Sequence, residues 1–545
     1  MSGQAIRTLV PLVVATLCLH LILIQPNHPH AVGWDALFLF PLELPAIVLA
    51  LIALPASRAL TAMRAFITLA LTVIVALKVA DYVSFSTLSR GFNPVADLPM
   101  IEALIRLLTG AVVQVLAAIA VLAALLAVCA VASLVWWATG VWSRVSLPQG
   151  LSISAGIVAV AVTVFAVAEV GHVMKTWRLP FDPPGTAFTA RVGVERGIMV
   201  RNTLAELRAF RVAVREDPFA DQVGLLNAID RDVLVIFVES YGRTSFDRPF
   251  YADLHRATLA RYEAQLAALG LSMQSGFLTS PTKGGQSWLS HATFANGLWV
   301  DNQIRHAAAL SSGRETLFHH AARNGFHTAT VMPQITLDWP EAERMGFDLI
   351  LPAKDLGYQG LPFNWVTMPD QFTLAALDRL VRNVERPEPS FVQVALASSH
   401  APWVPIPDII PWDSIGDGTI FNDIATSGDP PEVVWRDRER VRLQYKLAVD
   451  YALQSVLEYA VLHAPDPPLI VVVGDHQAAE FIALDNRSDV PLHIIGPAHL
   501  VERLSEVAPY PGLLPDDAAD VFPMQQVRDA ILTAFTDVET SGVQQ

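Results

Sequence analysis

The feature that most constrains this chain is a series of five long apolar runs in its first 172 residues. Each run has about the 17–25 residues needed to cross a hydrocarbon layer roughly 30 Å thick, and the fourth is long enough to tilt. The pattern therefore predicts five transmembrane helices, with the rest of the chain folding in water. The runs cover residues 6–25, 36–54, 65–82, 109–137 and 151–170.

Arginine placement predicts the orientation of these spans. The loop 26–35 contains no Lys or Arg, so the positive-inside rule places the N-terminus in the cytoplasm and the large C-terminal part outside. A multi-pass protein of a bacterial-type inner (plasma) membrane with a periplasmic or extracellular main domain is expected. A cleaved signal peptide over the first run is the less favoured alternative, because no small-x-small site follows it. The arginines on the cytoplasmic side are Arg7, Arg58, Arg64 and Arg144.

Composition indicates two unlike parts joined together. The 545 residues are 52% hydrophobic, yet the formal net charge is −15, and the acidic balance argues against nucleic acid as a partner. The only cysteines, Cys18 and Cys129, lie in predicted spans. The outer part must therefore fold without disulfides and has no cysteine nucleophile.

Three segments are expected along the chain: a five-helix membrane domain at 1–171, a juxtamembrane linker at 172–230 and an outer domain at 231–545. The linker combines helical apolar spacing with several arginines. Its amphipathic helix either lies on anionic headgroups or packs on the domain with a solvated arginine face, and both readings stay open here. No feature indicates an oligomeric state.

Short, continuous, β-branched runs mark the outer domain. They are separated by helical stretches at 252–269, 371–384 and 436–463. Continuous apolar runs are typical of strands buried on both faces, so an α/β domain with a mostly parallel sheet covered by helices is expected. The runs are "DVLVIFVES" (232–240), "FHTATVM" (326–332), "SFVQVALAS" (390–398) and "PPLIVVVGDH" (467–476).

Polar residues follow three of these strands. Glu239 ends the first, His400 follows the third, and Asp475 with His476 ends the fourth. In such sheets ligands bind at the carboxyl ends of the strands. Each residue alone is typical of a cap, a surface acid or a structural histidine, but Glu239, Asp475 and His476 together predict a site for one divalent cation. These hard ligands suit Mn²⁺ or Mg²⁺, with Zn²⁺ as an alternative.

A three-ligand site leaves a position that Ser287 can fill. It lies in "SPTKGGQSWLSHATFANG" (280–297), where a loop turns into a predicted helix. Metal coordination favours the alkoxide of a serine, the two glycines let the backbone approach closely, and helix N–H groups face an anion. The alternative is that Ser287 is only the N-cap of the helix.

The ordered motifs resemble the sulfatase-like branch of the alkaline phosphatase superfamily, and more closely lipoteichoic acid synthase and the related phosphoglycerol and phosphoethanolamine transferases. Together with the N-terminal spans, the resemblance covers nearly the whole chain. The motifs are "FVES" (237–240), "KGGQSWLSHATFANG" (283–297), "SSHAPW" (398–403), "GDH" (474–476) and "DVPLHIIGP" (489–497).

The resemblance implies a role for each matching residue. Glu239, Asp475 and His476 would bind the metal, with Ser287 as fourth ligand and nucleophile; in the lipoteichoic acid synthases a threonine takes that place and the metal is manganese. His400 matches a histidine that contacts the region of the substrate phosphate.

The substrate pocket departs from the family pattern. Trp339 resembles the pocket tryptophan, but Met332 and Glu341 stand where a histidine and an arginine are expected. These departures bring the phosphoglycerol headgroup into question and leave the metal centre untouched. Ser287 is not followed by the proline and arginine of the formylglycine motif, which argues against sulfate esters.

The expected reaction moves a phospho-alcohol group from a phospholipid headgroup, through a covalent phosphoserine, to an envelope glycan, a lipid or water. His400 and His291 are the candidates for proton transfer, since His291 lies one helical turn beyond Ser287. Lys283 is a candidate to neutralise phosphate charge. The alternatives are a packed helix residue for His291 and a flexible surface lysine for Lys283.

Two rival functions stay open. One is another enzyme of the same superfamily: a phosphoethanolamine transferase, a phosphodiester or phosphonate hydrolase, or a sulfatase-type hydrolase. The other is a catalytically inactive membrane sensor or scaffold that keeps the fold. Bound metal without turnover would favour the second.

Overall fold

The computed structural model divides the chain into two compact units, residues 1–207 and 208–545. Helix α7 (Phe188–Ala213) crosses this boundary, within the stretch predicted as a linker. The residues described are 3–88, 90–98, 114–181, 183–337, 339–365, 367–516 and 518–537.

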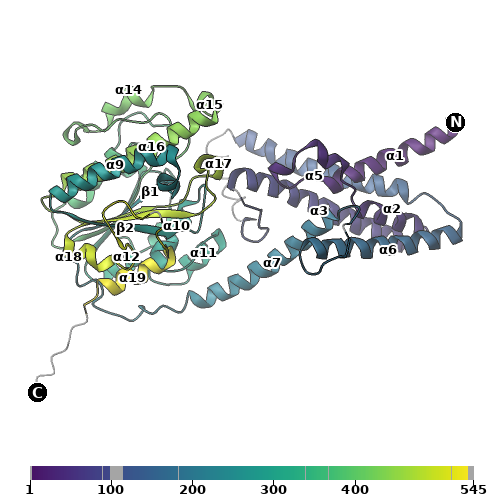
Figure 1. Cartoon of the computed structure of the whole chain (residues 1–545), viewed down its shortest axis with the longest axis horizontal. Coiled ribbons are helices and arrows are strands. Elements are labelled where there is room, and N and C mark those ends of the chain that lie inside the picture. Colours follow the sequence, from purple (N-terminus) through teal and green to yellow (C-terminus); the bar gives the residue numbers. More distant parts are fainter. Residues whose placement is uncertain are drawn as a thin grey trace, which may run out of the picture. The chain divides into compact units, whose positions relative to one another are not determined.

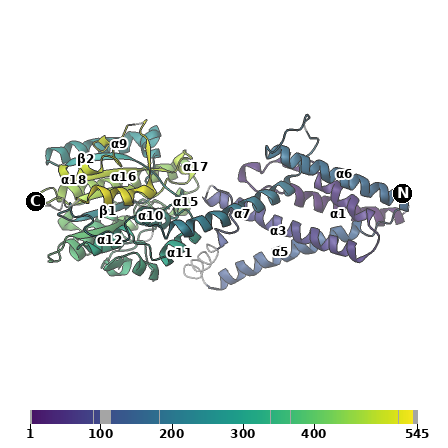
Figure 2. The same ribbon diagram turned by 90° about the horizontal axis from the view of Figure 1, so that it is seen from below.

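The first unit is built from helices. Helix α5 packs beside both α1 and α3 (Figure 2), and α2 packs on α6. Among the described residues, three helices are long and apolar enough to cross a membrane, and they lie in α3, α5 and α6. The start of the fourth predicted span, 109–113, lies outside the described residues. The helices are α1 (Gly3–Ile24), α2 (Glu43–Ala53), α3 (Arg58–Leu88), α5 (Gln114–Trp142) and α6 (Gln149–Val173).

The first two predicted spans correspond to shorter apolar helices, Leu9–Ile24 and α2. Helix α2 has 11 residues, which amounts to about 16 Å of helix. The apolar residues before it form a short 3-10 turn at Trp34–Phe38 instead. Pro41 explains this difference, because a proline disfavours helical backbone in the residue before it and cannot continue a helix running into it.

Helix α7 contributes a buried charge to the first unit. Arg196 is 8% exposed and contacts Asp81 of α3, which is 0% exposed. Its Nη2 donates to both carboxylate oxygens of Asp81 at 2.6 Å. Arg196 therefore lies neither on headgroups nor on a solvated face, whereas Arg201 is exposed. The sequence pattern did not separate these two arginines.

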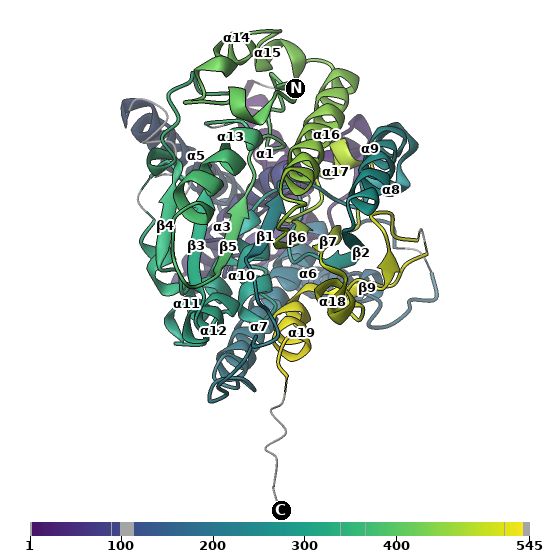
Figure 3. The same cartoon turned by 90° about the vertical axis from the view of Figure 1, so that its left-hand side faces the viewer.

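The second unit contains one nine-stranded sheet in the order β4-β3-β5-β1-β6-β7-β2-β8, with β9 paired to β2 (Figure 3). The five strands from β4 to β6 are parallel, and β7 then runs antiparallel to both β6 and β2. The strands are β1 (Val233–Val238), β2 (Ser272–Thr279), β3 (His327–Met332), β4 (Leu349–Pro352), β5 (Ser390–Ala395), β6 (Leu469–Gly474), β7 (Asp489–Gly496), β8 (Tyr510–Pro511) and β9 (Val521–Pro523).

Helices cover both faces of this sheet (Figure 1). Along β1, Leu234 and Ile236 belong to one core cluster and Val235 and Phe237 to the other, as the alternation of side chains in a strand requires. The first cluster packs under α9 (Pro249–Ala268), α13 (Asp370–Leu377) and α16 (Arg438–Leu462). The second packs under α10 (Ser287–Asn296), α12 (Leu317–Arg323) and α19 (Val527–Ala534).

The four predicted strands are present as β1, β3, β5 and β6, and the expected α/β sheet covered by helices is confirmed. Strand β2 was not predicted. Its sequence, SMQSGFLT, is too polar to read as a buried strand, and it forms because β7 on one side and β8 and β9 on the other supply its hydrogen-bond partners.

Candidate metal centre and active site

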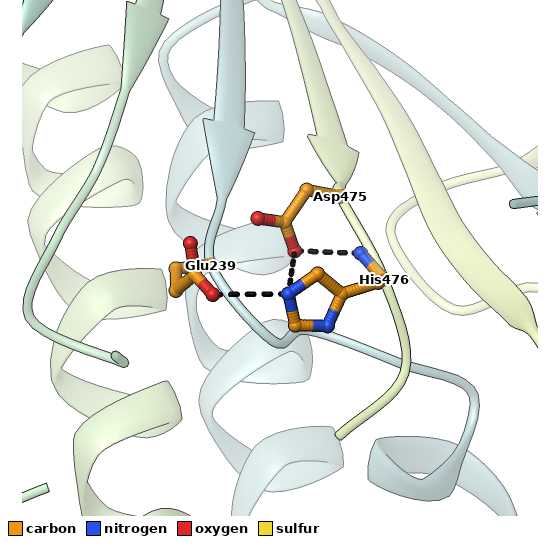
Figure 4. A group of neighbouring side chains, drawn as sticks. All are labelled: Glu239, Asp475 and His476. Atoms are coloured by element: carbon orange, nitrogen blue, oxygen red, sulfur yellow. Dashed lines mark hydrogen bonds and ion pairs between the residues drawn. The ribbon is translucent and has the colours of Figure 1, made fainter. Parts of the chain in front are cut away.

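The three predicted metal ligands meet at the carboxyl ends of β1 and β6 (Figure 4). The pairing of Val238 with Gly474 places the residues that follow them side by side. His476 Nε2 lies 3.0 Å from Glu239 Oε1 and 3.8 Å from Asp475 Oδ1. One ligand atom from each residue lies within 4.8 Å of the other two, which is the spacing of a set that can surround one ion.

The backbone at this edge holds the Asp475 carboxylate in place. The amides of Ser240 and His476 donate to Asp475 Oδ1 at 2.8 and 2.6 Å. Ser240 has a φ of +56°, a strained value for a residue that is not glycine. Gly474 allows the close approach of the two strand ends, because a Cβ there would lie 1.9 Å from the carbonyl oxygen of Tyr241.

Burial and mutual interaction shift the pKa of all three groups in the cluster. Burial opposes ionisation of Glu239, but the adjacent His476 imidazole outweighs it and holds the pKa of Glu239 well below its ordinary value. Burial and the Glu239 charge raise the pKa of Asp475 well above its ordinary value. Burial disfavours a charged His476, yet the two carboxylates raise its pKa to about 9. The site thus attracts positive charge.

The residues present fit a divalent cation. Glu239, Asp475 and His476 are 4%, 1% and 1% exposed, and two buried carboxylates next to each other are costly unless a cation balances them. The two carboxylates are hard ligands of the kind that Mn²⁺ and Mg²⁺ accept, and the imidazole is a borderline ligand that also suits Zn²⁺. The described residues contain no other cluster of this kind.

Ser287 lies against this cluster. It is the first residue of α10, and the N-cap residue is Gln286, with a φ of +67°. The N-cap alternative for Ser287 is therefore wrong. The hydroxyl of Ser287 instead donates to Glu239 Oε2 at 3.0 Å. Gly284 and Gly285, with φ of +74° and +137°, make the sharp turn that brings the serine there.

His400 follows β5 beside the cluster. The hydroxyl of Ser399 donates to the carbonyl of Glu239 at 2.6 Å, which ties this loop to the metal site. His400 is half-buried, and its Nδ1 lies 2.6 Å from the carbonyl oxygen of Ala401. A carbonyl can only accept, so Nδ1 carries the hydrogen and Nε2 is left for proton exchange.

His291 is buried one turn along α10 from Ser287. Its ring lies on that of Phe237, with centroids 4.1 Å apart, and burial lowers the pKa of His291 to about 4. Its Nε2 has no hydrogen-bond partner among the described residues. His291 is thus a neutral ring packed under the loop, and its role in proton transfer stays a prediction.

Lys283 and Trp339 each contact residues outside the cluster of Glu239, Asp475 and His476. The ammonium of Lys283 donates to the carbonyl of Asn486 at 2.9 Å, and its backbone pairs with Gln477. Trp339 is half-buried and packs against the core cluster on the α10 face of the sheet. Their substrate-binding roles stay predictions.

Gln334 is a site residue that the sequence analysis missed. It follows β3, and its Nε2 donates to Glu239 Oε2 at 3.3 Å and to the carbonyl of Leu396 at 3.1 Å. The available signal was its position, since it is a polar residue directly after a buried strand and could have been examined by the same strand-end rule.

Comparisons with known proteins give structural neighbours only. No family model matches the chain, and no curated protein matches it. Solved structures similar to it include the lipoteichoic acid synthase LtaP from Listeria monocytogenes, with 12% identity, a TM-score of 0.36 and coverage of 62% of this chain and 78% of that one.

Two further solved structures are also similar to this chain. The phosphoglycerol transferase GacH of Streptococcus pyogenes, solved with sn-glycerol-1-phosphate, has 14% identity and a TM-score of 0.33, with coverage of 62% and 92%. The C-terminal periplasmic domain of EptC from Escherichia coli has 13% identity and a TM-score of 0.35, with coverage of 55% and 81%. Because the likeness is distant, the chemistry below follows from this chain's own residues.

Proposed function

We propose that this chain is a membrane-anchored, metal-dependent enzyme that transfers a phospho-alcohol group from a phospholipid headgroup to a hydroxyl acceptor. The observation that carries the proposal is the hydrogen bond from Ser287 Oγ to Glu239 Oε2, which puts a nucleophile against a three-ligand cation site. An envelope glycan is the acceptor we favour. Phosphoethanolamine transfer and diester or phosphonate hydrolysis are the alternatives within the same chemistry.

Glu239, Asp475 and His476 would hold the ion, with Ser287 as a fourth ligand, and we favour Mn²⁺. The ion supplies the positive charge that favours a serine alkoxide at neutral pH. The three ligands hold that charge at the strand ends, and the turn through Gly285 presents the serine oxygen to it. The hydroxyl alone is a weak nucleophile.

The residues then act in two steps. In the first step Ser287 Oγ gives its proton to water and forms a bond to phosphorus. The bond from phosphorus to the lipid alcohol breaks, and the departing oxygen takes the proton that a doubly protonated His400 carries on Nε2. In the second step the acceptor hydroxyl returns a proton to His400 Nε2 and bonds to phosphorus, while the bond from phosphorus to Ser287 Oγ breaks and the serine alkoxide is restored. The Nδ1 contact of His400 with Ala401 fixes which ring nitrogen exchanges protons.

We also propose the finer membrane arrangement. The three long apolar helices anchor the chain. In our proposal α1 and the apolar run 36–54, of which the short α2 is only a part, complete five spans, with the N-terminus in the cytoplasm and the catalytic domain outside. A tethered domain meets headgroups at high effective concentration, which suits a lipid donor. The same proposal keeps 231–545 as the catalytic domain.

The deciding experiment is the mass of the active-site peptide. The full-length protein is purified in detergent, incubated with phosphatidylglycerol or phosphatidylethanolamine and Mn²⁺, and digested. We expect an added phosphoglycerol or phosphoethanolamine on Ser287, and the mass identifies the donor headgroup. A formylglycine mass would instead indicate a sulfatase.

The Ser287→Ala variant should lose turnover of an artificial phosphodiester by more than about a thousandfold. Ser290→Ala is the matched control. Ser290 lies in the same helix, and within the described part of the chain the hydrogen-bond partner of its hydroxyl is that of Ser280, at 2.9 Å, rather than a carboxylate of the cluster. Turnover by Ser287→Ala at the wild-type rate would refute the proposal.

A further inference from the structure

Gln334 joins the ends of three neighbouring strands. It lies two residues beyond β3, and its single amide nitrogen bonds both Leu396, directly after β5, and Glu239, directly after β1. Strands β3, β5 and β1 are adjacent in the sheet. The side chain therefore reaches across β5 to a metal ligand on the next strand.

The contacts of the Glu239 carboxylate differ at its two oxygens. Oε2 accepts from Ser287 Oγ at 3.0 Å and from Gln334 Nε2 at 3.3 Å. Oε1 lies 3.0 Å from His476 Nε2 and accepts from Ser240 Oγ at 3.3 Å. Rotation about the last side-chain bond of a glutamate otherwise costs little energy. These contacts therefore decide which oxygen of Glu239 faces Asp475 and His476.

We propose that Gln334 is a positioning residue of the metal centre: its amide orients the Glu239 carboxylate and adds no charge of its own. Both amide hydrogens are used, one on Glu239 and one on Leu396, so the nitrogen is held at the strand edge. A lysine or arginine there would satisfy Oε2 but compete with the cation for Glu239. A carboxylate could not donate at all.

The inference rests on the metal centre of the proposed function, and outer partners of metal ligands are known to set both geometry and affinity. The test uses the full-length protein in detergent, freed of metal and titrated with Mn²⁺. Two quantities are measured: the dissociation constant by calorimetry, and the melting temperature with and without Mn²⁺.

Gln334→Met keeps the length of the side chain and removes both donors. We expect the Mn²⁺ dissociation constant to rise by about 10–100-fold, with little change in the melting temperature of the metal-free protein. Wild-type Mn²⁺ affinity in this variant would overturn the inference.

Gln334→Lys tests whether the hydrogen-bond donor at this position has to be neutral. The ammonium keeps hydrogen atoms for Glu239 and Leu396 but places a positive charge beside the cation site. We expect Mn²⁺ to bind more weakly than to Gln334→Met. Wild-type affinity in Gln334→Lys would show that charge at this position is irrelevant and would contradict the role assigned to the neutral amide.

Gln454→Met is the matched control. Gln454 is also half-buried, and its Nε2 also donates to a carboxylate, Asp450 Oδ2, at 2.7 Å. It lies in α16, and none of its hydrogen bonds reaches a metal-site residue. Unchanged Mn²⁺ affinity is expected there. An equal loss in both Met variants would mean general loosening and would refute the positioning role.

Glu239→Gln distinguishes failure of the inference from failure of the proposed function. It removes one ligand and should abolish Mn²⁺ binding. If Glu239→Gln still bound Mn²⁺ with wild-type affinity, the metal centre itself would be wrong. If Glu239→Gln lost Mn²⁺ binding while Gln334→Met kept wild-type affinity, only the positioning role of Gln334 would be refuted.

Discussion

At the scale of single residues, Glu239 organises the site. Its two carboxylate oxygens contact Ser287 on one side and His476 on the other, and its backbone carbonyl accepts from Ser399 next to His400. This one residue thus links β1, β6, α10 and the loop after β5. Replacement of the Glu239 side chain should therefore also disturb the positions of Ser287 and His476, which contact its carboxylate.

Asp370 is another buried acid, and it gives a prediction about pH. It is 0% exposed, and Oδ1 accepts from the amides of Ala397 and Ser398 at 2.8 and 2.9 Å, in the loop that leads to His400. Burial raises the pKa of Asp370 from 3.8 to about 6. Because the folded pKa is above the unfolded one, the native state binds more protons between these values, and the free energy of unfolding falls as pH rises through this window.

Asp370→Asn removes that titration. We expect the melting temperature of the variant, relative to wild type, to improve as the pH is raised from about 4 to about 7. Melting curves of both proteins in the same detergent across this range measure the difference. A difference that does not change with pH would contradict the prediction.

At the scale of elements, the turn before α10 determines where Ser287 lies. Gly285 has a φ of +137°, and a Cβ there would meet no atom within 4 Å, so the cost of Gly285→Ala is conformational, about 1–3 kcal/mol. We expect this variant to lose most of its phosphodiester turnover, because the serine oxygen shifts away from Glu239. Steady-state rates with an artificial substrate provide the measurement.

Gly313→Ala is the control for the turn. Gly313 also has a positive φ, +76°, and open space around it, but it lies outside the site. We expect a stability loss without a loss of turnover. Equal turnover in Gly285→Ala and wild type would show that the serine position tolerates a different turn.

Helix α7 contributes a buried ion pair to the first unit, whereas its sequence predicted arginines on headgroups or on a solvated face. The Asp81–Arg196 pair is buried in the first unit, where Asp81 also accepts from the amide of Phe92 at 3.0 Å and from Asn27 at 3.2 Å. Breaking such a pair leaves an uncompensated buried charge and costs about 3–5 kcal/mol.

Arg196→Met should therefore lower the melting temperature of the detergent-solubilised protein markedly. Asp81→Asn combined with Arg196→Met should recover part of the loss, since no lone charge remains. Thermal melts of the two single variants and the double variant form the cycle. Additive losses would show that the two side chains are not coupled.

At the scale of the whole molecule, the number of spans decides the side on which each loop lies. If the second unit lies outside the cell in both cases, five spans place residue 30 outside as well. Three spans, formed by α3, α5 and α6 alone, would instead place residue 30 in the cytoplasm. We expect His30→Cys, in a background with Cys18 and Cys129 replaced by serine, to react with a membrane-impermeant maleimide in intact cells.

Two further positions calibrate the labelling. Ser427→Cys, exposed in the second unit, should also react in intact cells, and Ser146→Cys should react only after lysis. Protection of residue 30 with labelling of residue 427 would support three spans. Labelling of residue 146 in intact cells would reverse the predicted orientation.

The sequence alone determined the features that depend on local pattern. Continuous apolar runs identified β1, β3, β5 and β6, because strands buried on both faces need them. The carboxyl-end rule then predicted that Glu239, Asp475 and His476 lie together. The sequence did not predict β2, because this strand is polar and forms through the hydrogen bonds that neighbouring strands supply. It also did not predict the interruption of the apolar run before α2, which a single proline, Pro41, explains.

The tertiary structure decided which distant residues touch. Ser287 and Gln334 meet Glu239 across 48 and 95 residues of chain, and Arg196 meets Asp81 across 115. Such contacts depend on sheet register, loop path and side-chain rotamer, none of which local propensity specifies. The sequence thus determined the cluster of Glu239, Asp475 and His476, whereas only the folded chain decided that the hydroxyl of Ser287 and the amide of Gln334 share one oxygen of Glu239.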